Sequence, residues 1–261
     1  MVEELQNMKI CDYHIHIGQF NETYYDYHDV FNSLKLNAVE HCVCAYLTPR
    51  FDSEKIAIQF YESVVHELGE AQCFAESLKL DVKFLYWADP LVLQRIPLEK
   101  IFGKFKYFGI AIHPGLHIWS KEYSELLTEI FIFANKNSIP IFIHTGVSAY
   151  DEPLQFEKWF ADFPTVEVHL AHCKDSKPII MLFERYTQIY GDTAFCPKDS
   201  YEEICAAGFM ERMLFGTDFP ITHYYQKVRN NSIKENANLD ELKENYKALL
   251  AESSGVIYAT V

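Results

Sequence analysis

IPIFIHTG, residues 139–146, is a run of apolar side chains that ends in a histidine, a threonine and a glycine. Continuous hydrophobicity over so few residues is typical of a parallel strand that is buried on both faces. Similar runs, rich in Val, Ile, Phe and Tyr, recur at residues 8–15, 38–47, 81–89, 106–114, 165–173, 188–195 and 212–218. The sequence therefore predicts eight buried strands of the parallel type.

Segments with the helical spacing of apolar residues lie between these runs. They cover Tyr27–Leu36, Ser53–Leu80, Leu91–Phe102, Ser120–Asn137, Glu152–Phe163, Lys177–Tyr186, Ser200–Gly208 and Asn236–Ser253. Eight strand-then-helix units in 261 residues have the number and the length of a (β/α)8 barrel. We therefore predict an α/β fold, a TIM barrel that forms a single domain over residues 1–261.

Two details of this organisation are also predicted. The polar stretch Ile221–Asn238 is expected to be a long loop after the last strand, and Asp151 is placed to cap the helix that follows it. An open doubly wound sheet is the alternative fold. No strand, however, is followed by the glycine-rich motif with which such sheets bind a nucleotide.

The charge balance excludes some classes of partner. With 23 Lys and Arg against 37 Asp and Glu, the formal net charge is −14, and no basic cluster is present to bind nucleic acid or an anionic membrane surface. No run reaches the roughly 18 apolar residues of a membrane span, and MVEELQNMKI lacks the pattern of a signal peptide. We expect a cytoplasmic protein that acts on a small molecule, and a homo-oligomer stays open.

The seven cysteines include no CxxC pair, so a zinc ribbon or a disulfide framework is poorly supported. Most are expected to be buried free thiols. Cys173 next to His172 leaves open a nucleophilic cysteine, but neighbouring side chains on a strand point in opposite directions.

Polar residues that can carry chemistry stand at the ends of several predicted strands. In a (β/α)8 barrel these ends meet at one rim, where the active site is built. The residues are His14 and His16 on the first strand, His113 on the fourth, His144 on the fifth, His172 on the sixth and Asp218 on the eighth. We therefore predict that the active site is drawn from this set.

The His14–His16 pair predicts a metal site. Side chains two residues apart on a strand point to the same face, so both imidazoles can reach one cation. His144 and Asp218 would complete a set of three nitrogens and one oxygen, which suits zinc or another borderline divalent cation. Ordinary strand histidines are the alternative, which the other strand ends disfavour.

Three further residues are candidates for substrate binding. His113 is either a pocket residue or a structural residue of the turn that HPG begins. Arg50 and Lys174 each follow a strand end and could bind a substrate carboxylate, although a solvated loop charge is the other interpretation. Asp12, on the strand of the histidine pair, is expected to orient a ligand imidazole or a neighbouring loop.

Six motifs, in their order and spacing, resemble the amidohydrolase superfamily, most closely the TIM-barrel metal-dependent hydrolases of amidohydrolase family 2. They are CDYHIHIG, KFLYWADP, FGIAIHPG, IPIFIHTG, VEVHLAHC and MLFGTDFP, and the resemblance covers about residues 9–220. It implies that His14, His16, His144 and Asp218 are metal ligands. His172 matches the histidine that ligates a second metal in binuclear members and acts on water or substrate in mononuclear ones.

Two departures from the family pattern narrow these expectations. Binuclear members often carry a carboxylated lysine at the end of the fourth strand, where this chain has Ala111, so one metal ion is expected. We expect Zn²⁺, with Mn²⁺ or another divalent cation as alternatives. Adenosine deaminase-like members have a glutamate where this chain has Val147, which argues against purine deamination.

The resulting hypothesis is an enzyme, a metal-dependent hydrolase of an amide, lactone or ester bond in a small molecule. The metal would activate a water molecule, Asp218 would transfer its proton to the leaving group, and His172 would orient the water or polarise the substrate carbonyl. The first alternative is non-oxidative decarboxylation, for which Arg50 or Lys174 would hold the substrate carboxylate. The second is a barrel that binds metal or ligand without turnover.

Overall fold

The computed structural model describes residues 10–117, 119, 123–146, 148–229 and 239–252. The chain divides into two compact units. Unit 1 comprises Met1–Pro49, His66–Lys83 and Phe215–Val261, and unit 2 comprises Arg50–Val65 and Phe84–Leu214. The single domain expected over residues 1–261 stays a prediction.

The elements alternate between strand and helix along most of the chain. The strands are β1 (Ile10–Phe20), β2 (Thr23–Tyr25), β3 (Val39–Leu47), β4 (Asp81–Trp87), β5 (Gly109–Ile112), β6 (Ile141–His144), β7 (Val168–Ala171), β8 (Ile189–Asp192) and β9 (Met213–Leu214). The helices are α2 (Tyr27–Leu36), α3 (Glu54–Ser77), α4 (Pro90–Leu93), α5 (Leu98–Lys104), α6 (Pro114–His117), α7 (Ser124–Asn137), α8 (Glu157–Asp162), α9 (Ser176–Arg185), α10 (Lys198–Ala206), α11 (Ile221–Arg229) and α12 (Leu239–Glu252). Short 3-10 turns η2 (Pro153–Phe156) and η3 (Met210–Arg212) complete them.

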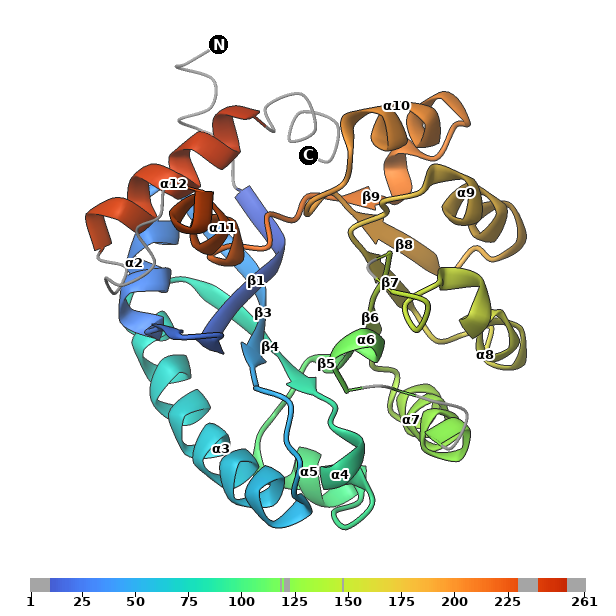
Figure 1. The fold of residues 1–261 in the computed structure, drawn as a ribbon, viewed down its shortest axis with the longest axis horizontal. Helices are drawn as coiled ribbons and strands as arrows, with labels where there is room; N and C mark the ends of the chain where they lie inside the picture. The colour runs from blue at the N-terminus through green and yellow to red at the C-terminus, as the bar shows by residue number, and fades with distance from the viewer. Residues whose placement is uncertain (1–9, 118, 120–122, 147, 230–238, 253–261) are drawn as a thin grey trace. The chain divides into compact units, whose positions relative to one another are not determined.

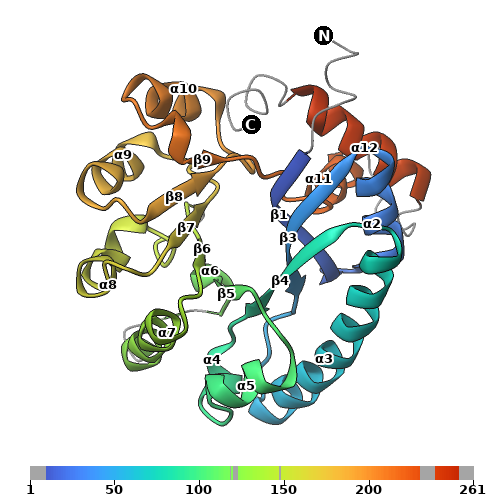
Figure 2. The same cartoon turned by 180° about the vertical axis from the view of Figure 1, so that it is seen from behind.

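Unit 1 is built around β1, which pairs in parallel with β3 and antiparallel with β2. The chain that follows β9 returns to β1, because the backbone N–H of Tyr13 donates to the Phe215 carbonyl at 2.8 Å and that of His16 donates to the Phe219 carbonyl at 2.7 Å. Helices α2 and α12 lie side by side on this unit (Figures 1 and 2). The residues before and after Asp218 are thereby fixed against the strand that carries His14 and His16.

Unit 2 contains a run of parallel strands. Successive strands from β4 to β9 pair with one another, and every pair is parallel. Helices α7, α8, α9 and α10 lie outside these strands (Figure 1). All eight predicted strands are confirmed, and parallel strands that alternate with helices confirm the predicted (β/α)8 fold class. Strand β2 was not predicted.

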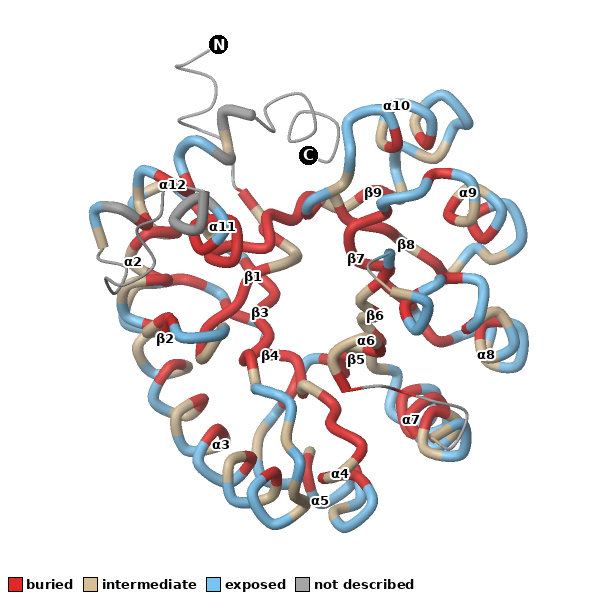
Figure 3. Tube along the Cα trace, viewed as in Figure 1, coloured by how far each residue is buried: buried red, intermediate tan, exposed pale blue. Residues whose placement is uncertain are grey.

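The strands are buried while the helices expose one face to solvent (Figure 3). All four residues of β5 and all four of β7 are buried. A strand that alternated between a buried and an exposed face would have only half of its side chains covered. The continuous apolar runs of the sequence are therefore explained by strands that are covered on both faces.

Most predicted helices are confirmed, with ends shifted by a few residues. The helix predicted over Leu91–Phe102 is wrong as one element, since α4 ends at Leu93 and α5 begins at Leu98. Pro97 explains the break, because proline has no N–H to donate within a helix and disfavours helical backbone at the residue before it. The helix predicted over Glu152–Phe163 begins with the 3-10 turn η2.

The long loop predicted over Ile221–Asn238 is wrong for its first half, where α11 forms. Ile221, His223 and Tyr224 are buried, and the Tyr224 ring packs edge-on against Phe20 with their centroids 5.0 Å apart. Burial of one side stabilises a helix that the polar composition did not indicate. Residues 230–238 lie outside the described residues. Within the described part of the chain, no helix is both long and apolar enough to cross a membrane.

Two glycines provide a matched test of packing. A Cβ atom on Gly191 would lie 2.4 Å from the Cys173 sulfur and 3.0 Å from the Met213 sulfur, whereas one on Gly69 in α3 would meet nothing within 4 Å. Gly191→Ala should lower the free energy of unfolding by about 1–3 kcal/mol through overpacking. Gly69→Ala should raise it by about 0.5–1 kcal/mol because alanine favours a helix. Urea unfolding checks both, and equal effects would contradict the packing account.

Candidate metal centre

The side chains of His14 and His16 lie next to each other on β1 of unit 1. Their Nε2 atoms are 3.1 Å apart. The Nδ1 atom of His16 lies 3.2 Å from the carbonyl oxygen of Ala45, and because a carbonyl only accepts, Nδ1 carries the hydrogen. In this tautomer the lone pair of His16 is on Nε2, the atom that would bind a metal.

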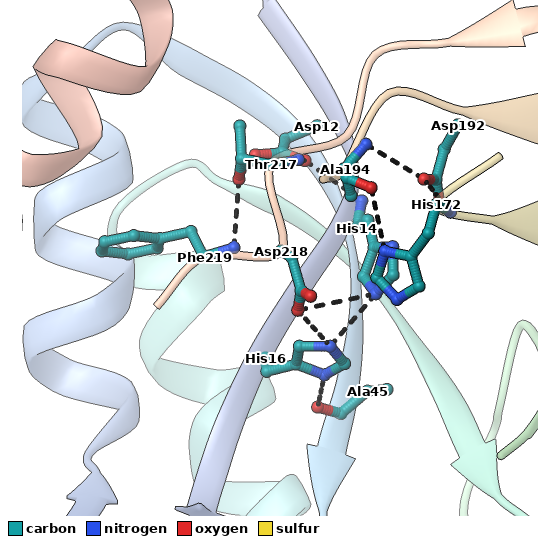
Figure 4. Close-up of polar contacts among 10 residues, drawn as sticks. All are labelled: Asp12, His14, His16, Ala45, His172, Asp192, Ala194, Thr217, Asp218 and Phe219. Carbon is teal, nitrogen blue, oxygen red and sulfur yellow. Dashed lines mark hydrogen bonds and ion pairs between the residues drawn. The ribbon is translucent and has the colours of Figure 1, made fainter. Parts of the chain in front are cut away.

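Asp218 brings a carboxylate to this pair. Its backbone N–H donates to the carbonyl of His14 at 2.8 Å. Its Oδ1 atom then lies 3.0 Å from Nε2 of His16 and 3.8 Å from Nε2 of His14 (Figure 4). The backbone of Asp218 has a φ of 55°, in the left-handed region that Asp and Asn tolerate better than most residues. The structure thus brings three predicted ligands of unit 1 together.

These three atoms fit a divalent cation. Donors that lie about 2.0–2.1 Å from a tetrahedral metal are separated from each other by about 3.3 Å. The observed separations among the two nitrogens and the oxygen run from 3.0 to 3.8 Å. Two neutral imidazoles and a carboxylate are ligands that zinc and other borderline divalent cations accept. These three residues of unit 1 therefore fit part of the ligand set of a divalent cation.

Asp12 holds the backbone next to two of these proposed ligands, His14 and Asp218. Its Oδ1 atom accepts from the backbone N–H groups of His14 and Thr217, and its Oδ2 atom accepts from the hydroxyls of Thr217 and Tyr246. Burial raises the pKa of Asp12 to about 6, against these hydrogen bonds, which favour the charged form. Asp12 was expected to orient either a ligand imidazole or a neighbouring loop. Its bonds to Thr217 show that it orients the loop that follows β9.

In unit 2, His172 is held at a fixed orientation. Its backbone, with a φ of 72°, donates its N–H to Oδ1 of Asp192 at 2.9 Å. Its Nδ1 atom lies 2.8 Å from the carbonyl oxygen of Ala194, so Nδ1 carries the hydrogen and Nε2 is the acceptor (Figure 4). Asp192 was missed by sequence reasoning, although it is a polar residue within the predicted strand 188–195 and ends the observed strand β8.

His113 and His144 lie with His172 in unit 2. The rings of His113 and His144 are stacked, with centroids 3.6 Å apart and planes 16° apart, and the His144 and His172 centroids are 4.4 Å apart. Burial, and then the neighbouring His144, lower the pKa of His113 to about 2, which favours its neutral form. The Nδ1 atom of His113 accepts from the backbone N–H of Leu116. The structure thus groups three predicted site histidines.

The remaining predicted residues are less closely tied to these groups. Arg50 and Lys174 are both exposed. The stem of Lys174 runs beside Gly146, since a Cβ atom on Gly146 would lie 3.1 Å from that of Lys174. Cys173 is fully buried and burial raises the pKa of its thiol well above the usual value, which removes it as a nucleophile. The predicted ligand set draws on both units, and the joining of His144 to His14, His16 and Asp218 stays a prediction.

Two histidines with lowered pKa values, His113 and His117, give the fold a predictable response to acid. Burial also lowers the pKa of His117, to about 4. Below a pH of about 6.5 the unfolded chain binds protons on His113 and His117 that the folded chain does not, so the free energy of unfolding should fall as pH falls from about 6.5 toward 4. Urea unfolding of metal-free protein at several pH values measures this decline. His117→Gln should flatten it, whereas the same change at exposed His66 should not; equal slopes would contradict the assignment.

Part of this chain matches a protein-family model. Residues 103–232 match the family model described as Amidohydrolase. This range contains His113, His144, His172 and Asp218, and it begins after the His14–His16 pair. No curated protein matches the chain.

Solved structures show the fold. A probable 2-pyrone-4,6-dicarboxylic acid hydrolase from Acinetobacter baumannii, solved with citric acid bound, has a TM-score of 0.61 at 11% identity over 96% of each chain. 5-Carboxyvanillate decarboxylase from Novosphingobium aromaticivorans, complexed with manganese, has a TM-score of 0.56 at 12% identity over 83% of this chain and 78% of that chain. 2,6-Dihydroxybenzoate decarboxylase from Rhizobium has a TM-score of 0.54 at 12% identity over 94% of this chain and 100% of that chain. The resemblance predicted from the six motifs is confirmed by the family model, which matches residues 103–232.

Proposed function

We propose that this protein is a metal-dependent hydrolase that cleaves an amide, lactone or ester bond in a small molecule. The observation that carries the proposal is the arrangement of His14, His16 and Asp218, whose Nε2 and Oδ1 atoms lie 3.0–3.8 Å apart. The family match supports it. The proposed ligand set adds His144, at the end of β6, as the fourth ligand.

The side chains of the site have separable roles. When bound, the cation supplies Lewis acidity, which lowers the pKa of a water molecule toward neutrality. Asp218 takes the proton of the attacking water on its carboxylate and passes it to the leaving group. His172, whose Nδ1–H is held by Ala194, offers Nε2 to orient the water or, once protonated, to polarise the substrate carbonyl.

The charge of the site favours this chemistry. Three neutral imidazoles and one carboxylate around a divalent cation leave a net charge of about +1. Such a site stabilises the negative charge that develops on a carbonyl oxygen under attack. We propose Zn²⁺ as the cation because the donor set is rich in imidazole. Mn²⁺, which is named with solved structures of 5-carboxyvanillate decarboxylase, is the alternative.

The second candidate function is non-oxidative decarboxylation of a carboxylic acid. The observation that favours it is Lys174, whose stem runs beside Gly146, two residues beyond His144. An exposed ammonium group there offers a partner to a substrate carboxylate, and Arg50 is the other candidate. Two of the solved structures that share the fold are decarboxylases. A barrel that binds metal without turnover is the third candidate.

A substrate panel separates these functions. Metal-loaded protein should hydrolyse at least one class among lactones, esters and amides, with release of acid followed at constant pH. Release of carbon dioxide from aromatic carboxylic acids would instead favour the decarboxylase. Bound metal with no turnover on either panel would favour the non-catalytic barrel.

His172→Asn distinguishes the role of His172 from that of the ligands. The variant should keep its metal and lose roughly 100-fold or more in rate, because only the group that acts on water or substrate is removed. Metal content and rate are measured on the same preparation. If the variant loses metal in step with activity, His172 is a ligand and the site is binuclear.

The proposal extends to the substrate class and the location of the enzyme. We propose a small-molecule substrate, because the acidic composition and the absence of a basic cluster in the sequence disfavour nucleic acid and anionic membranes as partners. We also propose a cytoplasmic location. Self-association into a homo-oligomer stays open.

A further inference from the structure

Asp151 is a buried carboxylate that the proposed chemistry does not use. Its side chain is 0% exposed. It was predicted to cap the helix that follows, but the cap position of η2 is Glu152, and the Asp151 Oδ2 atom instead accepts from the hydroxyl of Ser148 at 3.0 Å. Its Oδ1 atom has no hydrogen-bond partner among the described residues. Burial of a carboxylate without all of its hydrogen bonds costs folding free energy. A functional role would explain why the protein keeps Asp151 there.

The loop and α6 are shaped to hold this carboxylate in place. The backbone N–H of Asp151 donates to the carbonyl of Ser148, and its own carbonyl accepts from the N–H of Gly146. On the opposite side lies Gly115 in α6. A Cβ atom on Gly115 would lie 2.6 Å from Oδ2 of Asp151 and 3.0 Å from Oδ1. Any other residue at position 115 would displace the carboxylate. The absence of a side chain on Gly115 therefore leaves the space that the Asp151 carboxylate occupies.

The carboxylate faces the imidazole of His144. Its Oδ2 atom lies 3.7 Å from Nδ1 of His144, roughly 0.8 Å beyond the usual hydrogen-bond length. The ring of His144 is held in its plane by the stacked ring of His113, which is itself fixed by the bond from Leu116. A small rotation of the carboxylate or of the imidazole within that plane closes the distance.

A cation shared by His113, His144 and Asp151 is the rival interpretation, since their donor atoms lie within 4.8 Å of one another. The ring geometry argues against it. An imidazole lone pair lies in the plane of its ring, and these two rings are stacked 3.6 Å apart at 16°. A metal in the plane of one ring would therefore lie far out of the plane of the other. The Nδ1 lone pair of His113 is also taken by the N–H of Leu116.

We propose that Asp151 is a positioning residue for His144: it accepts the Nδ1–H of the imidazole and thereby presents the Nε2 lone pair as the ligand atom. This inference rests on the proposed function, in which His144 binds the metal. Carboxylates that accept from the second nitrogen of a ligand histidine fix its tautomer and raise its basicity, and their loss costs roughly 10–100-fold in metal affinity.

The first experiment reads the tautomer of His144 in metal-free wild-type protein. Long-range proton–nitrogen correlation spectra of ¹⁵N-histidine-labelled protein distinguish an Nδ1–H imidazole from an Nε2–H imidazole, and His144→Gln assigns the signal. The spectrum should show His144 as Nδ1–H. An Nε2–H tautomer would overturn the proposal, and this readout needs neither activity nor a variant of Asp151.

The second experiment measures Zn²⁺ affinity by competition with a chelator in wild-type protein and in Asp151→Ala, Asp151→Asn and Ser148→Ala. Asp151→Ala should weaken binding roughly 10–100-fold, and Asp151→Asn less, because its amide oxygen can still accept. Ser148→Ala should have a smaller effect than either, since the carboxylate remains. Glu152→Gln, a change to the exposed next residue, is the matched control and should bind as wild type does.

The outcomes separate this proposal from the function on which it rests. If His144→Ala loses Zn²⁺ and Asp151→Ala binds as wild type does, the positioning role is wrong and the ligand set stands. If His144→Ala keeps wild-type affinity, the ligand set itself is wrong. If His113→Phe, which keeps a ring to stack on His144 but offers no nitrogen to a metal, weakens binding as much as Asp151→Ala does, the rival cation site is correct and the proposal falls.

Discussion

Asp218→Asn should lower kcat by roughly three to four orders of magnitude while the protein remains folded. The carboxylate is the proposed carrier of the proton between water and leaving group, and its Oδ1 atom lies 3.0 Å from Nε2 of His16. An amide has nearly the same shape but neither accepts a proton at neutral pH nor carries the charge that balances the cation. Initial rates on the substrate found in the panel measure the loss.

Asparagine is the appropriate replacement because the backbone of Asp218 is left-handed, with a φ of 55°, and asparagine tolerates that conformation. The free energy of unfolding should therefore change by less than about 1 kcal/mol. Asp218→Ala serves as the comparison, because it loses the same chemistry and strains the backbone. Activity of Asp218→Asn within about tenfold of wild type would exclude the proposed role of Asp218 in proton transfer.

The second large effect concerns stability rather than rate. Asp12→Ala should lower the free energy of unfolding by about 3 kcal/mol or more. The change removes the carboxylate that accepts hydrogen bonds from the hydroxyls of Thr217 and Tyr246 and from two backbone N–H groups. Asp12 and Tyr246 are both 0% exposed, so water does not replace the lost partner. Urea unfolding at pH 7 measures the change.

A double-mutant cycle isolates this network. Tyr246→Phe removes one of its hydrogen bonds and should cost about 1 kcal/mol in wild-type protein. In the Asp12→Ala background the same change should cost much less, because its partner is already absent. A stability of Asp12→Ala within about 1 kcal/mol of wild type would contradict the network.

The strands were predictable because their pattern is local. Runs such as IPIFI, residues 139–143, are apolar throughout, as a parallel strand that is covered on both faces requires. Strand β2 could not be found in this way, because its three residues, one of them exposed, pair with the end of β1 after a short turn. Helix α11 was missed for a related reason, since it packs against residues far away in the chain, such as Phe20.

The site was predictable as far as it depends on residue type at a strand end. His14, His16 and Asp218 lie together in unit 1, and His113, His144 and His172 lie together in unit 2, while one site drawn from both groups stays a prediction. The residues that orient them were harder to find. Tyr246 reaches Asp12 from α12, 234 residues away, and Asp151 lies in a loop whose path no periodicity encodes. Asp192 did carry a signal, because it ends a strand as the predicted site residues do.

Metal content tests the central claim most directly, since the proposed chemistry requires the cation that His14, His16 and Asp218 are arranged to hold. Metal-free protein is reconstituted with Zn²⁺ or Mn²⁺, and the bound metal is counted by mass spectrometry. Wild-type protein should bind about one ion per chain, and His16→Ala and Asp218→Ala should each weaken binding at least roughly 100-fold while the exposed control His66→Ala does not. Wild-type protein that binds neither cation, or His16→Ala and Asp218→Ala variants that keep a full equivalent, would contradict the account.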